Sequence, residues 1–149
     1  MIVIGCDHGG LELKQTLITY LTSIGEGVTD CGTYNSDSVD YPDIAEKTCK
    51  RYLDGGYDFG ILICGTGIGI SMAANKIDGI RCALVGTEYA AEMTKRHNDA
   101  NFLAFGGRVT GPELAISILK AYMNAEFEGG RHQKRIDKIH ALEAQEETE

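Results

Sequence analysis

The sequence predicts an α/β fold in which helices cover both faces of a parallel β-sheet. Short apolar runs alternate with longer amphipathic stretches from the first residue onward, which is typical of a parallel sheet whose strands are connected by helices. The length of 149 residues suits one domain that buries roughly two-thirds of the surface of its unfolded chain. A glycine-rich turn directly after an apolar run indicates a loop at the carboxyl edge of the sheet, where open α/β folds bind ligands.

The first half of the chain contains three predicted strands and two predicted helices. The apolar run 2–4 is a strand, and a helix follows because Leu13, Leu17, Leu21 and Ile24 recur at three- and four-residue spacing. A short strand is expected near 28–31, and a polar loop covers 32–41. Pro42 helps to begin a helix at 43–53, and the sequence FGILIC at 59–64 forms the central strand.

The second half continues the alternation. A helix is expected at 66–77, a strand at 81–85, a helix at 88–97, a strand at 102–105 and a helix at 112–124, which begins at a proline. The last segment is rich in charge but keeps Ile136, Ile139 and Leu142 at helical spacing, which predicts a helix over about 131–145. Its narrow apolar stripe needs a surface to lie on, either its own domain or a neighbouring subunit. The terminal residues are expected to fray.

Composition narrows the class of protein. The formal net charge of −8 and the sequence pI of about 5.0 argue against a general nucleic-acid binder. Five cysteines at irregular positions fit neither a disulfide framework nor a paired zinc signature, and we expect a reducing cytoplasm. The amino terminus lacks the features of a signal peptide, and the apolar stretch 60–74 falls short of the ~20 residues needed to cross a bilayer. We expect a soluble protein with no membrane partner.

The stretch ILICGTGIGI places Cys64 where the central strand meets three alternating glycines, Gly65, Gly67 and Gly69. The dinucleotide fingerprint needs glycine at the position of Ile70, a thiol phosphatase loop needs arginine there, and the Gly-Lys-Ser/Thr of a P-loop is absent. A glycine turn that enters a helix directs backbone N–H groups at one point, which suits an anion or a developing oxyanion.

A helix N-terminus also favours the thiolate form of a cysteine. A thiol base beside oxyanion donors suits proton abstraction next to a carbonyl. The alternative is that Cys64 is a small core residue that ends a buried strand.

Two further pairs of polar residues flank predicted strands. Asp7 and His8 follow the first strand and so reach the same edge as Cys64, unless they form only a solvated turn. His97 and Asn98 precede the fifth strand, so in one subunit they should lie at its amino end, away from Cys64. A partner subunit could bring them to the site; the alternative is helix capping.

Positive charge is concentrated after two glycine pairs in an otherwise acidic chain. Arg108 follows Gly106-Gly107, and Arg131 and Arg135 follow Gly129-Gly130 at a spacing of four. Two arginines on one helical face can hold one phosphate by charge-assisted hydrogen bonds. The alternative, a solvated cationic helix start, is disfavoured by the helix dipole.

Six segments in this order and spacing resemble the ribose/galactose isomerase family, and within it the type B ribose-5-phosphate isomerases. They are GCDHGG, Asp40-Tyr41-Pro42, ILICGTGIGISMAANK, RHNDAN, FGGRV and EFEGGRHQKR, and they span nearly the whole chain. The resemblance implies a single Rossmann-like three-layer α/β/α sandwich over residues 1–149 with a five-stranded parallel sheet. It also implies a homodimer whose subunits share the active sites; pairing of dimers into tetramers stays open.

The resemblance also implies roles for individual residues. Cys64 corresponds to the base that moves a proton between C1 and C2, and Gly65 to Gly69 to the turn that holds the enediolate. The residues that correspond to ring opening and to hydroxyl contacts are Thr66, His97, Asp7, Tyr41 and Asn98. The phosphate contacts correspond to His8, Arg108, Arg131 and Arg135. Some members carry a glutamate base in the following helix; this chain, with Met72 and Ala73 there, resembles the cysteine group.

The expected reaction is therefore the reversible isomerisation of D-ribose 5-phosphate and D-ribulose 5-phosphate, without a metal or organic cofactor. Backbone donors would stabilise the enediolate, and the histidines and cysteines show no short zinc-ligand spacing. Two alternatives remain: an allose or galactose 6-phosphate isomerase of the same family, and a non-catalytic sugar-phosphate sensor.

Overall fold

The computed structural model describes residues 1–143 and shows one five-stranded sheet. The strands are β1 (Ile2–Cys6), β2 (Val28–Asp30), β3 (Phe59–Cys64), β4 (Cys82–Leu84) and β5 (Phe102–Gly106). Their order in the sheet is β2-β1-β3-β5-β4, and every pairing is parallel. The predicted five-stranded parallel sheet is thus confirmed, and β3 has the predicted limits.

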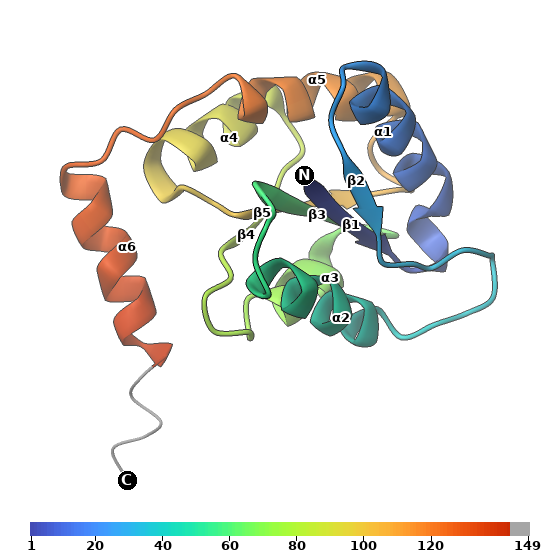
Figure 1. Cartoon of the computed structure of the whole chain (residues 1–149), viewed down its shortest axis with the longest axis horizontal. Helices are drawn as coiled ribbons and strands as arrows, with labels where there is room; N and C mark the ends of the chain where they lie inside the picture. The colour runs from blue at the N-terminus through green and yellow to red at the C-terminus, as the bar shows by residue number, and fades with distance from the viewer. Residues whose placement is uncertain (144–149) are drawn as a thin grey trace, which may run out of the picture.

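Helices cover both faces of the sheet, as predicted. Figure 1 shows α1 (Leu11–Ser23), α4 (Glu88–Met93) and α5 (Pro112–Met123) on one side, and α2 (Tyr41–Leu53) and α3 (Ile68–Ala74) on the other. Two short turns, η1 (His8–Gly10) and η2 (Thr94–Asn98), flank β1 and β5, and α6 (Arg131–Ala141) stands apart from the layers (Figure 1). No helix of the described residues is long and apolar enough to cross a membrane.

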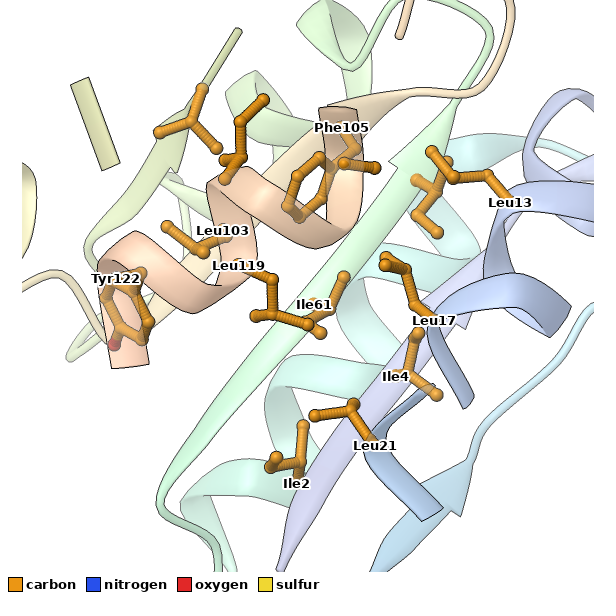
Figure 2. Packing of buried hydrophobic residues seen from close by; sticks show 14 of the residues in the cluster. Ile2, Ile4, Leu13, Leu17, Leu21, Ile61, Leu103, Phe105, Leu119 and Tyr122 are labelled. Carbon is orange, nitrogen blue, oxygen red and sulfur yellow. The ribbon is translucent and has the colours of Figure 1, made fainter. Parts of the chain in front are cut away.

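The alternation of side chains along the strands builds two apolar layers. Ile4, Ile61 and Phe105 point toward α1 and α5, where they meet side chains such as Leu17 and Leu119 (Figure 2). The intervening strand residues pack against α2 and α3 in a second cluster. Each fully buried side chain of this size contributes about 1.5–3 kcal/mol, so both faces hold the sheet in place.

A buried lysine ties the first helix to the polar loop 32–41. The side chain of Lys14 is 1% exposed, and its Nζ lies 2.9 Å from Oδ1 of Asp30 and donates to the carbonyl oxygen of Thr33. The ring of Tyr34 lies 5.0 Å from the same nitrogen. The apolar stripe of the helix did not predict this contact, because the partners of Lys14 lie 16 and 19 residues further along the chain.

Several predicted helix limits differ from the structure: α2 begins at Tyr41 and not at 43, and α3 ends at Ala74 and not at 77. The helix expected at 66–77 is α3, which begins only at Ile68 because Gly67 adopts a left-handed conformation, with φ of 79°. The helix expected at 88–97 ends at Met93, and η2 follows as a π-turn closed by Asp99, whose φ is 43°. The last helix ends at Ala141; residues 144–145 and the end predicted to fray lie outside the described residues.

Candidate active site

Cys64 ends the buried strand β3 and lies against the glycine turn. Its side chain is buried, and its Sγ accepts a hydrogen bond from the backbone N–H of Gly67 at 3.1 Å. A methyl group on Gly67 would lie 2.8 Å from the carbonyl carbon of Phe105, so the turn needs glycine there for space as well as for its left-handed φ. The hydroxyl of Thr66 accepts from the N–H of Ile68 at 3.2 Å and closes the turn.

Three turns meet at the carboxyl edge of the sheet through direct backbone contacts. The N–H of Gly107 donates to the carbonyl of Cys64 at 2.8 Å, and the N–H of Arg108 donates to the carbonyl of Gly65 at 3.0 Å. A methyl group on Gly107 would lie 2.4 Å from the carbonyl oxygen of Gly9. The ends of β1, β3 and β5 therefore form one continuous surface, as the predicted parallel sheet requires.

Asp7 and His8 lie on this surface at the end of β1. The N–H of Asp7 donates to the carbonyl of Ile63 at 3.0 Å, and its buried carboxylate accepts from the N–H of Gly9 at 2.8 Å. Nδ1 of His8 accepts from the N–H of Val39 at 3.3 Å, which places the ring hydrogen on Nε2 in the neutral tautomer. Both side chains are thus oriented by backbone groups of neighbouring turns.

Tyr41 and Arg108 flank the glycine turn. A methyl group on Gly69 would lie 2.6 Å from Cζ and 2.9 Å from the hydroxyl oxygen of Tyr41. A methyl group on Gly65 would lie 3.1 Å from Nη1 of Arg108. The structure therefore gathers nine of the thirteen predicted site residues at one edge: Asp7, His8, Tyr41, Cys64, Gly65, Thr66, Gly67, Gly69 and Arg108.

The other four predicted residues lie at the opposite end of the sheet. His97 and Asn98 belong to η2, which precedes β5, whereas Cys64 pairs with Gly106 at the far end of that strand. The four-residue rise from the start of β5 separates these ends by about 13 Å. Arg131 and Arg135 are on α6, which packs beside η2. Within one chain, the site predicted from the resemblance is therefore divided.

A cluster that the sequence did not predict surrounds His97. The imidazoles of His97 and His132 are stacked, with ring centroids 4.3 Å apart and planes inclined by 11°. Glu128 lies 3.8 Å from Nε2 of His97 and 3.4 Å from Nε2 of His132, and it pairs with Nε of Arg96 at 2.6 Å. Glu128 and His132 lie in the segment EFEGGRHQKR, in which the sequence predicted a functional role only for the two arginines.

The same cluster contains the groups that could hold a metal ion. Nitrogen atoms of His97 and His132 and a carboxylate oxygen of Glu128 all lie within 4.8 Å of one another. Two imidazoles and one carboxylate form a ligand set that zinc accepts. Among the described residues, this is the group of three side chains whose ligand atoms are close enough together to share a metal ion. It lies away from Cys64.

Three arginines are free to bind an anion. Arg81 and Arg96 are engaged by carbonyl or carboxylate groups of the protein. Arg108, Arg131 and Arg135 are exposed and have no ion pair or side-chain hydrogen bond within residues 1–143. These three are the arginines that the resemblance assigns to phosphate.

The other four cysteines have thiols whose pKa is raised. Burial raises the pKa of Cys6 to about 11 and that of Cys49 to about 12, and it also raises the pKa of Cys31 and Cys82. These four thiols stay protonated at neutral pH. All five cysteines are free.

The fold and the turn define an α/β protein whose carboxyl sheet edge carries a glycine turn suited to a small anionic ligand. The family model described as Ribose/Galactose Isomerase matches residues 2–139. The chain is 48% identical over 142 residues to "Ribose-5-phosphate isomerase B" of Escherichia coli (strain K12), and the match covers 95% of both chains.

Solved structures agree with these sequence matches. Ribose-5-phosphate isomerase B of Clostridium thermocellum has a TM-score of 0.95 and 48% identity, and the match covers 97% of this chain and 98% of that chain. The Mycoplasma genitalium ribose-5-phosphate isomerase B with bound ribulose-5-phosphate has a TM-score of 0.92 and 41% identity, over 97% and 96% of the two chains. The chain therefore belongs to the ribose/galactose isomerase family, which confirms the resemblance.

Replacing Gly107 with alanine should destabilise the protein, because its new methyl group would overlap the carbonyl oxygen of Gly9 at 2.4 Å. Overpacking of this kind typically costs about 1–3 kcal/mol of unfolding free energy. The matched control is Gly86→Ala, since nothing lies within 4 Å of the added methyl group there. Urea unfolding measures both; equal midpoints for the two variants would show that the turns do not depend on this contact.

Proposed function

We propose that this protein interconverts D-ribose 5-phosphate and D-ribulose 5-phosphate through an enediolate, with Cys64 as the proton-transfer base. The observation that carries the proposal is the position of Cys64, whose sulfur accepts a hydrogen bond from the turn that follows it. Such a bond is stronger to a thiolate than to a thiol. The likeness to the Escherichia coli and Mycoplasma genitalium isomerases supplies the substrate class.

The chemistry needs three proton transfers and no change of oxidation state overall. Cys64 removes the hydrogen of C2 from the open-chain aldehyde; C1 and C2 become doubly bonded, and O1 takes the negative charge. The proton returns from sulfur to C1 while the hydroxyl hydrogen of O2 passes to O1, and C2 becomes the ketone. N–H groups at the start of a helix have no carbonyl partner four residues earlier. Within the 65–69 turn, the N–H of Gly67 donates to Cys64 and that of Ile68 donates to Thr66, so the other N–H groups of the turn suit the charge on the enediolate.

Binding precedes this chemistry. Ribose 5-phosphate is mainly a closed ring, so we assign ring opening to His97 with Thr66, and contacts with the sugar hydroxyls to Asp7, Tyr41 and Asn98. The phosphate is assigned to His8, Arg108, Arg131 and Arg135. Arginine suits this role because its planar guanidinium donates two parallel hydrogen bonds to one phosphate.

We also propose that the catalytic unit is a homodimer, in which one subunit supplies Cys64 and its partner supplies His97. The separation of these residues in one chain supports this arrangement. Exposed apolar side chains beside the glycine turn also support it: Ile68 and Met72 lie one turn apart on α3, Leu84 lies next to Gly67, and all three are between 45% and 65% exposed. Contiguous exposed apolar side chains of this kind mark interaction surfaces. The free cysteines favour the reducing cytoplasm as its location.

Cys64→Ala should fold and bind a phosphorylated substrate analogue but lose the ~10²–10⁴-fold that general base catalysis contributes. The measurement is kcat on ribose 5-phosphate. Cys82→Ala is the control, because burial keeps that thiol protonated and it should retain activity. Near-normal turnover of Cys64→Ala would end the assignment.

The same assay separates the alternative functions. The wild-type protein should convert ribose 5-phosphate with a higher kcat/KM than allose 6-phosphate or galactose 6-phosphate. A preference for a six-carbon substrate would identify the hexose branch of the family. Binding of all three without turnover would identify a sensor.

Mixing inactive Cys64→Ala and His97→Asn subunits should restore activity. A mixed dimer with shared sites has one site with both defects and one site with neither, so up to half of its sites can work. Activity is measured after subunit exchange has been verified by mass spectrometry. Exchange without recovered activity would contradict the shared site.

Arg135→Ala should raise the KM for ribose 5-phosphate and weaken inhibition by inorganic phosphate, because a charge-assisted contact is lost. It should also lower kcat to the extent that phosphate binding aligns C1 and C2 with Cys64. Lys134→Ala removes a neighbouring exposed cation and serves as the control. Values that are the same for both variants would remove Arg135 from the site.

A further inference from the structure

His132 has no role in the chemistry described above, yet it lies against His97, to which a role is assigned. Its side chain is 7% exposed and lies in the first turn of α6, stacked on His97 from η2. Its Nε2 is buried and has no hydrogen-bond partner among the described residues. Burying an imidazole nitrogen without a partner costs free energy, so the position needs an explanation.

Glu128 connects the two rings. One carboxylate oxygen lies 3.4 Å from Nε2 of His132, and the other lies 3.8 Å from Nε2 of His97. Arg96 fixes this carboxylate, since its Nε lies 2.6 Å away and its carbonyl accepts the N–H of Glu128 at 3.0 Å. The hydrogen bond from Arg96 holds the pKa of Glu128 below its usual value, so the carboxylate is ionised at neutral pH.

Burial, together with nearby cations, lowers the pKa of His132 below its ordinary value. Burial is the main cause of its lowered pKa, the charges of His97, Arg131 and Arg135 add to the effect, and Glu128 opposes it. At 3.8 Å from Glu128, Nε2 of His97 is beyond hydrogen-bond distance and stays available for another partner.

Holding α6 in place does not account for the stack. The far end of the helix is held separately, by Nη1 of Arg81 at 2.8 Å from Nε2 of His140 and by the N–H of Gly79 at 3.1 Å from Glu143. Ile136 supplies a buried apolar contact between the two ends. The stacked imidazole and the carboxylate instead converge on His97.

We infer that His132 and Glu128 are positioning residues for His97: the stacked ring fixes the plane of its imidazole, and the ionised carboxylate, 3.8 Å from Nε2, favours the ring orientation that turns this nitrogen toward it. The inference rests on the proposed ring-opening role of His97. A displacement of about 1 Å at a catalytic group can lower a rate by ~10²-fold, which is the scale of effect that such positioning controls.

The test compares a reaction that needs ring opening with one that does not. Net conversion of ribose 5-phosphate starts from the closed ring, whereas ribulose 5-phosphate cannot close a five-membered ring because its O5 carries the phosphate. Incorporation of solvent deuterium at C1 of ribulose 5-phosphate therefore reports enediolate formation by Cys64 alone.

His132→Ala should lower conversion of ribose 5-phosphate by at least about 10-fold and leave the deuterium exchange within about 3-fold of wild type. His132→Phe keeps the stacked plane and should recover most of the loss. Glu128→Gln should lose conversion selectively as well, while Glu126→Gln, an exposed carboxylate in the same loop, should match wild type.

Three results would overturn the inference: equal losses in both reactions, unchanged conversion in His132→Ala, or no difference between the alanine and phenylalanine variants. His97→Asn is assayed in parallel. If it leaves conversion unchanged, the proposed role of His97 fails. If it loses conversion while the His132 variants do not, only the positioning role fails.

Discussion

Close contact between backbones at the carboxyl edge of the sheet is the constraint on which the rest of the site depends. A methyl group on Gly107 would lie 2.4 Å from the carbonyl oxygen of Gly9, and one on Gly106 would lie 2.7 Å from the backbone of Thr66. Side chains cannot be inserted between these turns, so their separation is set by main-chain atoms and by the register of β1, β3 and β5. Backbone contacts of this kind deform little, because protein interiors are close-packed. The sulfur of Cys64 is consequently placed by the sheet.

The same sheet also divides the chemistry. Parallel strands have their carboxyl ends at one edge of the sheet, so residues that directly precede a strand lie at the opposite edge. Cys64 ends β3 and His97 precedes β5, so one chain cannot bring them together without a change of fold. The proposed two-fold symmetric dimer would overcome this separation, because each of its two identical contacts would join the carboxyl edge of one subunit to η2 and α6 of the other.

The basic side chains fall into two groups, those paired with carboxylates of the protein and those left exposed. The protein is acidic overall, and it neutralises some of its cations internally: Lys14 is buried against Asp30, and Arg96 lies against Glu128. Glu128 thereby has two neighbours of different kinds, an arginine that keeps it ionised and a pair of imidazoles that it faces. Three exposed arginines form no ion pair within the described residues: Arg108, Arg131 and Arg135. Their guanidinium groups are therefore available to a dianionic ligand.

The sequence by itself determined the sheet and most of the residues at its functional edge. Apolar runs predicted all five strands, and the position of Cys64 at the end of the run FGILIC predicted its place at the carboxyl edge, since both depend on neighbouring residues alone. The tertiary structure decided the rest. The start of α3 depends on a left-handed Gly67 packed against Phe105, and the environment of His97 depends on Glu128 and His132, about 30 residues further along the chain. Contacts over such separations depend on how whole helices and strands pack, so the local pattern of apolar residues does not predict them.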